Sequence, residues 1–102
     1  MSRDVSVDCR LSPEGFTCDV VVGTDAAATR HTVTVSREDL ARLAPGHFDP
    51  LQLVRASFEF LLAREPRESI LRSFALPVIE RYFPGYEAEI RREMDASTAP
   101  LA

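Results

Sequence analysis

The fold is decided in residues 5–22, which read VSVDCRLSPEGFTCDVVV. Apolar and polar side chains alternate on both sides of a short turn at residues 12–15, where a proline fixes φ and a glycine accepts a positive φ. Strict alternation is typical of a strand with one buried face and one solvated face. The alternation returns in residues 30–36, so the sequence predicts a three-stranded antiparallel meander over about residues 5–36.

Helical spacing replaces the alternation from residue 36 onward. Residues 36–39, SRED, form a capping-box pattern that predicts a short helix. Asp49 is a good N-cap and predicts a central helix over about residues 50–63. Phe48, directly before the N-cap, is predicted to pack against Leu53 in the first turns of this helix. This helix carries more large apolar residues than one face needs. We therefore expect the rest of the domain, or a partner, to cover it on more than one side.

The remaining helices are short. Pro66 and Pro77 are typical of first-turn prolines and predict two of them, the first reaching residue 74. Residues 86–94 form a last amphipathic segment, and the tail over residues 95–102 is expected to fray. The fold class is therefore α+β, with four or five short helices in residues 37–94 packed on one face of the meander, in a single domain over the whole chain.

Composition excludes several functions. The 102 residues include 12 basic and 16 acidic residues, a formal net charge of −4, which argues against a general nucleic-acid binder. Every basic residue is arginine, and this bias is typical of a GC-rich bacterial genome. No apolar run could span a bilayer and the first residues lack the apolar core of a signal peptide, so the expected location is cytoplasmic.

Two cysteines form the most informative pair. If the four-residue turn closes the first hairpin, Cys9 lies directly opposite Cys18. We interpret them first as two reduced thiols packed as small apolar groups, with a disulfide and a metal site as alternatives. His31 points to the same face and would add a third ligand, but the Cys-x8-Cys spacing is not that of a metal-binding knuckle. We expect His31 to be a strand residue at the sheet edge.

No residues with catalytic spacing stand out. The chain contains no Gly-x-Ser-x-Gly turn and no glycine-rich phosphate loop. His47 lies near Asp49, but that carboxylate is better explained as a helix cap, so His47 is expected to be a loop residue. The sequence thus predicts no catalytic, cofactor-binding or metal-binding residue and no enzyme activity.

An aromatic cluster offers a candidate interaction surface. Tyrosine and phenylalanine beside an arginine resemble the composition of interface hot spots, although core packing would explain the same residues. The candidate residues are Phe60, Arg81, Tyr82, Phe83 and Tyr86.

Two resemblances bear on function. The segments ESILRSF (68–74) and VIERYFPGYE (78–87) resemble a recurrent pattern in small bacterial proteins of unknown function, which implies a stand-alone, bacterial, cytosolic protein and supplies no catalytic residue. The order strand, helix, turn, helix in residues 31–64 is similar to the ribbon–helix–helix module of bacterial repressors and antitoxins. That resemblance implies that Arg30, Thr32 and Thr34 enter the major groove of DNA.

The leading hypothesis is a non-enzymatic interaction or accessory protein that acts through its helical half, with a protein partner or a second copy of itself. The chain is expected to bind no cofactor, no nucleic acid and no membrane. A ribbon–helix–helix-like DNA-associated regulator or antitoxin is the alternative.

Overall fold

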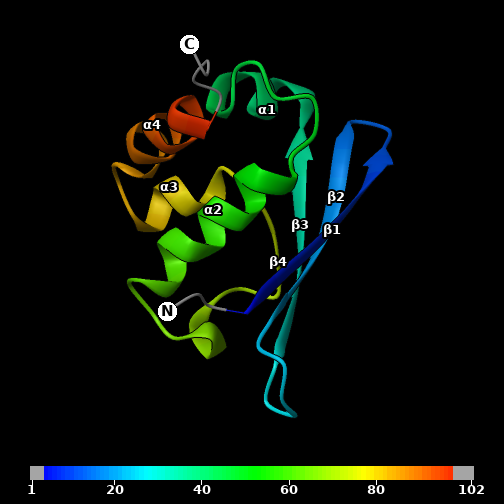
Figure 1. Ribbon diagram of the computed structural model, residues 1–102, viewed down its shortest axis with the longest axis vertical. Coiled ribbons are helices and arrows are strands. Elements are labelled where there is room, and N and C mark those ends of the chain that lie inside the picture. Colours follow the sequence, from blue (N-terminus) through cyan, green and yellow to red (C-terminus); the bar gives the residue numbers. More distant parts are fainter. Residues whose placement is uncertain (1–3, 98–102) are drawn as a thin grey trace.

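The first three strands form the antiparallel meander that the alternation predicts. In the computed structural model, which describes residues 4–97, β1 (Val5–Ser12), β2 (Gly15–Val22) and β3 (Thr29–Ser36) lie side by side (Figure 1). The four-residue turn sets the register, so Cys9 pairs with Cys18, as predicted.

Gly15 lies where the first turn meets the end of β3. A Cβ at this position would overlap the carbonyl oxygen of Val35 and lie 2.8 Å from the Cα of Ser36. All three nearest atoms belong to the backbone, which has little freedom to move away. The turn therefore requires glycine for close packing as well as for its chain reversal.

A fourth strand, β4 (Ser73–Ala75), pairs parallel with β3, and the sheet order is β1-β2-β3-β4. The predicted helix from Pro66 to residue 74 is wrong: this segment contains the single 3₁₀ turn η1 (Arg67–Ser69) followed by extended chain. The reason lies in β3: one edge of this strand pairs with β2, and the backbone N–H and C=O groups of its other edge need partners as well. The Thr32 N–H donates to the Arg72 carbonyl at 2.7 Å, and the Leu76 N–H donates to the Thr34 carbonyl at 3.0 Å. A helix over this segment would leave those groups of β3 unsatisfied.

Four α-helices cover one face of the sheet (Figure 1): α1 (Arg37–Leu43), α2 (Leu51–Leu62), α3 (Val78–Tyr82) and α4 (Tyr86–Ser97). The predicted helix starts are confirmed. Ser36 Oγ accepts from the Asp39 N–H at 3.0 Å, and Asp49 Oδ1 accepts from the Leu51 N–H at 3.0 Å. The predicted packing of Phe48 on Leu53 is wrong, because Phe48 is 93% exposed. The tail was predicted to fray from residue 95, but residues 95–97 belong to α4. The rest of the predicted tail lies outside the described residues.

The surplus of apolar residues on α2 is explained within the chain. One side of α2 packs against the sheet, burying Val54 and Phe58, while α4 covers a second side. Tyr86, Ile90 and Met94, spaced four residues apart in the predicted amphipathic segment, are the buried residues of α4. Sheet and helices thus share one apolar cluster, and α2 lies at its centre.

Candidate groove at the end of the helical layer

An open apolar groove lies where the C-terminal end of α2, the η1–β4 segment and α3 meet. Its volume is about 290 Å³, close to the lower end of the range of roughly 300–1,000 Å³ typical of ligand pockets. That size suits one or two apolar side chains of a partner. The groove is lined by Leu61, Glu65, Ser69, Ile70, Leu71, Phe74, Val78, Ile79, Tyr82 and Phe83.

The groove has a fixed apolar floor and an exposed rim. Leu61, Ile70 and Ile79 are at most 5% exposed and form the floor. On the rim, Leu71 is 47% exposed and Tyr82 is 65% exposed. Large apolar residues that are exposed beside a concave apolar surface are typical of an interaction site.

Glu65 is the only carboxylate among the described residues that line this groove, and none of them is an arginine, lysine or histidine. Its side chain is half-buried, and within residues 4–97 it forms no ion pair or side-chain hydrogen bond. A carboxylate in this setting is incompletely solvated and gains from a cationic neighbour. The groove is therefore complementary to an apolar group that has a basic group beside it.

Arg67 holds one wall of the groove in place. Its guanidinium covers Gly23 in the β2–β3 loop, donates to the Val22 carbonyl at 3.4 Å and pairs with Asp25 at 3.5 Å. Arg67 also pairs with the neighbouring Glu68 at 3.3 Å. These contacts fix η1 against the meander and so position Ile70 and Leu71.

Glu80 fixes the opposite wall. Its carboxylate accepts the Gly85 N–H at 2.9 Å and the Glu87 N–H at 2.8 Å, so α3 caps the start of α4. The hydrogen bond from the Glu87 N–H, and then the one from Gly85, lower the pKa of Glu80 because they favour its charged form. The angle between α3 and α4 is thereby set by a side chain of α3.

The structure divides the predicted aromatic surface into an exposed part and a buried part. Tyr82 and Phe83 line the groove, and Arg81 is exposed on the same short helix. Phe60 is half-buried, with edge-on contacts to Phe83 at 6.1 Å and Tyr86 at 5.2 Å between ring centroids.

Tyr86 does not belong to the surface, since it is fully buried. Ser57 Oγ donates to the Leu53 carbonyl at 2.7 Å, so the hydroxyl of Tyr86 must be the donor in its 2.6 Å bond to Ser57 Oγ. Burial raises the pKa of the Tyr86 phenol. Tyr86 therefore joins α4 to α2 through a buried polar contact and supports the groove from behind.

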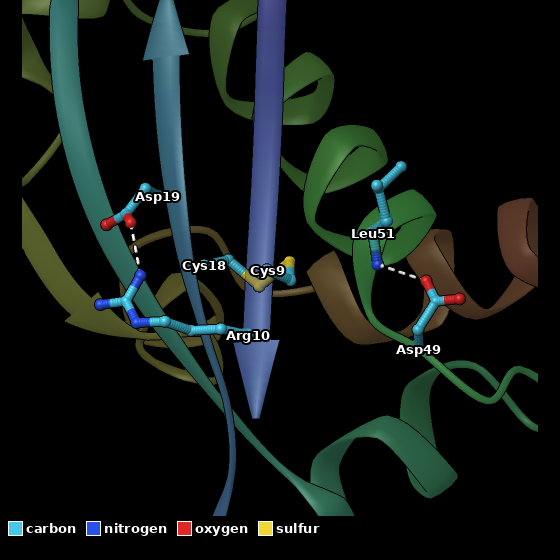
Figure 2. Close-up of a disulfide and its surroundings, with 6 residues drawn as sticks. All are labelled: Cys9, Arg10, Cys18, Asp19, Asp49 and Leu51. Carbon is cyan, nitrogen blue, oxygen red and sulfur yellow. Dashed lines mark hydrogen bonds and ion pairs between the residues drawn. A yellow bond between two sulfur atoms is a disulfide. The ribbon is translucent and has the colours of Figure 1, made fainter. Parts of the chain in front are cut away.

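The two cysteines are joined. Their Cα atoms lie 4.0 Å apart and the sulfurs form a disulfide across β1 and β2, in place of the reduced thiols that the sequence favoured (Figure 2). Cys18 is fully buried and Cys9 is half-buried on the helix-facing side of the sheet. Within residues 4–97, no group of three or more His, Cys, Asp or Glu side chains could hold a metal ion.

Neither histidine has the environment of a catalytic residue. His31 is not at the sheet edge, because β4 covers that side of β3. It is 3% exposed, with Nδ1 donating to the Leu71 carbonyl at 2.8 Å and Nε2 bonded to Thr29 Oγ1 at 2.9 Å. His47 is half-buried in its loop, 3.4 Å from the Met94 carbonyl. His31 therefore acts as a structural link between β3 and the groove wall at Leu71.

Comparisons with family models, curated proteins and solved structures give no match for this chain. The two resemblances drawn from the sequence therefore stay predictions. In the part of the chain that the structure describes, no helix is both long enough and apolar enough to cross a bilayer.

Sequence reasoning missed half of the groove. Ile70 and Leu71 were placed in the predicted helix that starts at Pro66, and Glu65 directly before it, whereas the 3₁₀ turn η1 and the extended chain after it bring all three beside α3. Pro66 was the available signal, since the residue preceding a proline is biased away from helical conformation.

Proposed function

We propose that this chain is a non-enzymatic interaction protein whose groove binds an apolar segment of a protein partner that carries a basic residue. The observation that carries the proposal is the pair of exposed rim residues, Leu71 and Tyr82, beside the unpaired carboxylate of Glu65. An aromatic and an aliphatic residue around an apolar floor are the usual anchors of such interfaces. The acidic residue supplies selectivity, because it penalises partners with an acidic side chain at that place.

Selection from a random peptide display library against the immobilised chain tests this proposal. Enriched peptides are expected to combine an apolar side chain with arginine or lysine within one or two positions. Their affinity, measured by fluorescence polarisation, is expected to fall roughly tenfold or more in Leu71→Asp and in Tyr82→Ser. Glu65→Lys is expected to remove the preference for basic peptides.

Phe48→Ser is the matched control. Among residues 4–97, Phe48 is the most exposed large apolar residue, at 93%, and it does not line the groove. Its substitution is expected to leave peptide binding unchanged. Equal binding by the Leu71→Asp variant, or enriched peptides that are acidic, would contradict the proposal.

The DNA-associated alternative has no comparable support. A ribbon–helix–helix strand pairs with the same strand of a second copy, whereas β3 has β2 on one side and β4 on the other. The polar residues Arg30, Thr32 and Thr34 lie on a strand inside the sheet, so the pairing that this module requires is not available to them.

The cytoplasm is retained as the proposed location, and the disulfide provides its test. A cytosolic pair of this kind is kept reduced unless it is protected or acts in redox chemistry. The test is to trap free thiols in intact native cells and to analyse Cys9 and Cys18 by mass spectrometry. Reduced thiols are expected for a cytoplasmic protein. A fully oxidised pair would instead indicate an oxidising compartment.

A further inference from the structure

We propose that two copies of this chain pair through their β1 strands, antiparallel and centred on Cys9, to form one continuous sheet. This surface is separate from the groove, so the proposal does not depend on the proposed function.

β1 is a long strand at the open edge of the sheet. Its eight residues pair with β2 in an unbroken register, and its other edge pairs with no strand among residues 4–97. β1 is the first strand in the sheet order β1-β2-β3-β4. Natural edge strands are usually protected by proline, lysine or other charged side chains, a bulge, short length or a covering element. β1 carries one charge of each sign, Asp8 and Arg10, but it contains no proline or lysine, pairs without a bulge and is eight residues long, whereas β4, at the opposite edge, is only three residues long.

The hydrogen-bond alternation shows which residues present backbone groups to this edge. The Gly23 N–H donates to the Asp4 carbonyl at 2.7 Å, which makes residues 4 and 23 a hydrogen-bonded pair. The even-numbered residues of β1 therefore bond to β2, and the odd-numbered residues direct their N–H and C=O groups outward. The short Cα–Cα distance of 4.0 Å at Cys9 and Cys18 agrees, since pairs without backbone hydrogen bonds are the closer ones.

A symmetric antiparallel pair can form only in a few registers. Outward-facing residues must oppose one another, so a two-fold axis has to pass through a residue of β1. With the axis at Cys9, Val7 lies opposite Leu11 of the second copy and Asp8 lies opposite Arg10 of the second copy. About six backbone hydrogen bonds form in this register.

Charge selects this register over its neighbours. An axis at Asp8 or at Arg10 places that residue directly opposite its own copy, and like charges in that position are destabilising. An axis at Val7 also gives an opposite-charge pair, Arg10 with Asp4 of the second copy, but it places Leu11 opposite residue 3, beyond the end of β1. The sequence order Asp-Cys-Arg is self-complementary only about Cys9, where both copies form an opposite-charge pair.

This pairing would remove two unfavourable features of the single chain, a pair of neighbouring carboxylates and an exposed leucine. Asp8 lies directly opposite Asp19 across β1 and β2, and Arg10 pairs with Asp19 rather than with Asp8 (Figure 2). Asp8 thus has a like charge as neighbour and no ion pair within the described chain, and Arg10 of the second copy would supply one. Leu11, which is 72% exposed, would be covered by Val7 of the second copy.

A charge-reversal pair tests the proposal by sedimentation equilibrium. The native chain is expected to double its mass with rising concentration. Asp8→Arg alone and Arg10→Asp alone each place like charges opposite one another twice, and each is expected to weaken association about tenfold or more. A mixture of the two variants restores both opposite-charge pairs and is expected to associate as a heterodimer, which also shows that each variant folds.

Cross-linking tests the register. Ser6 lies opposite Ser12 of the second copy only when the axis passes through Cys9, so the double variant Ser6→Cys/Ser12→Cys is expected to form a covalent dimer under oxidation, and either single variant is not. Three results would overturn the proposal: a native chain that stays monomeric, two single variants that associate as well as the native chain, or a mixture that does not associate. A monomer that captures an extended peptide of another protein along β1 would also overturn it.

Discussion

The meander and the helical half of this molecule are held together by different kinds of contact. Strands β1 to β3 pair with their sequence neighbours, and their disulfide joins residues nine positions apart. The helical half is held by contacts between distant positions, such as Ser57 with Tyr86 and Arg42 with Glu87, 29 and 45 residues apart. Damage to the meander should therefore unfold the whole domain, whereas damage to the helical contacts should loosen the groove and leave the strands paired.

The largest effect is expected from Gly15→Ala. The added methyl group meets the backbone of β3 and α1, so we expect a loss of about 3 kcal/mol in the free energy of unfolding. Gly46→Ala is the control, because Gly46 also has a positive φ, of 89°, but no atom lies within 4 Å of its added Cβ. That variant is expected to lose about 1 kcal/mol. Equal losses in urea unfolding would show that the close approach at Gly15 is unimportant.

Reduction of the disulfide is expected to have the next largest effect. Closing a loop over a separation of nine residues restricts the unfolded chain, and opening it should cost about 2–3 kcal/mol. Urea unfolding with and without a phosphine reductant measures this difference. The Cys9→Ser/Cys18→Ser variant should not respond to the reductant. An unchanged midpoint in the native chain would mean that the strand contacts alone determine its stability.

A smaller effect is expected in the helical half from Ser57→Ala. This change leaves the buried Tyr86 hydroxyl without its acceptor and should cost about 2 kcal/mol. Tyr86→Phe should cost less, because Ser57 still donates to the Leu53 carbonyl. The double variant should be more stable than Ser57→Ala alone, since no polar group is then left unpaired. A double variant less stable than either single variant would contradict this account.

The smallest effect is expected from Glu80→Gln, which weakens the two bonds that join α3 to α4. The pKa of Glu80 is lowered in the folded chain, so its contribution is present above the unfolded value of 4.5 and is lost as the pH falls through the folded pKa. The stability difference between the native chain and the variant should therefore shrink in acid. Thermal unfolding at pH 7 and at pH 3 measures it, and a difference that persists unchanged at pH 3 would exclude Glu80 as its source.

The sequence predicted the meander well because its determinants are local. The turn length at residues 12–15 fixes the register of β1 and β2, so the sequence alone is enough to place Cys9 opposite Cys18. The helix starts at Ser36 and Asp49 were equally local, since each depends on one side chain and a backbone N–H two or three residues later.

The segment over residues 66–76 could not be predicted in the same way. Three residues, Ser73–Ala75, are too short to show an alternation, and their strand conformation is imposed by the free edge of β3. The groove depends on this segment, so only its α3 side, Tyr82 and Phe83, was found. Tyr86 was included in the candidate surface by its composition, with core packing as the alternative, and the structure shows that it is buried with Ile90 and Met94.

The link between β3 and β4 has a consequence for the order in which the chain folds and opens. His31 and Leu71 are 40 residues apart, so this connection closes a long loop and is expected to form after the hairpins. The Thr32 amide donates to Arg72 across that connection, whereas by alternation the next amide along β3, that of Val33, points toward β2. Adjacent amides on one strand would therefore report two separate opening events in hydrogen exchange, detachment of the 66–76 segment and unfolding of the meander.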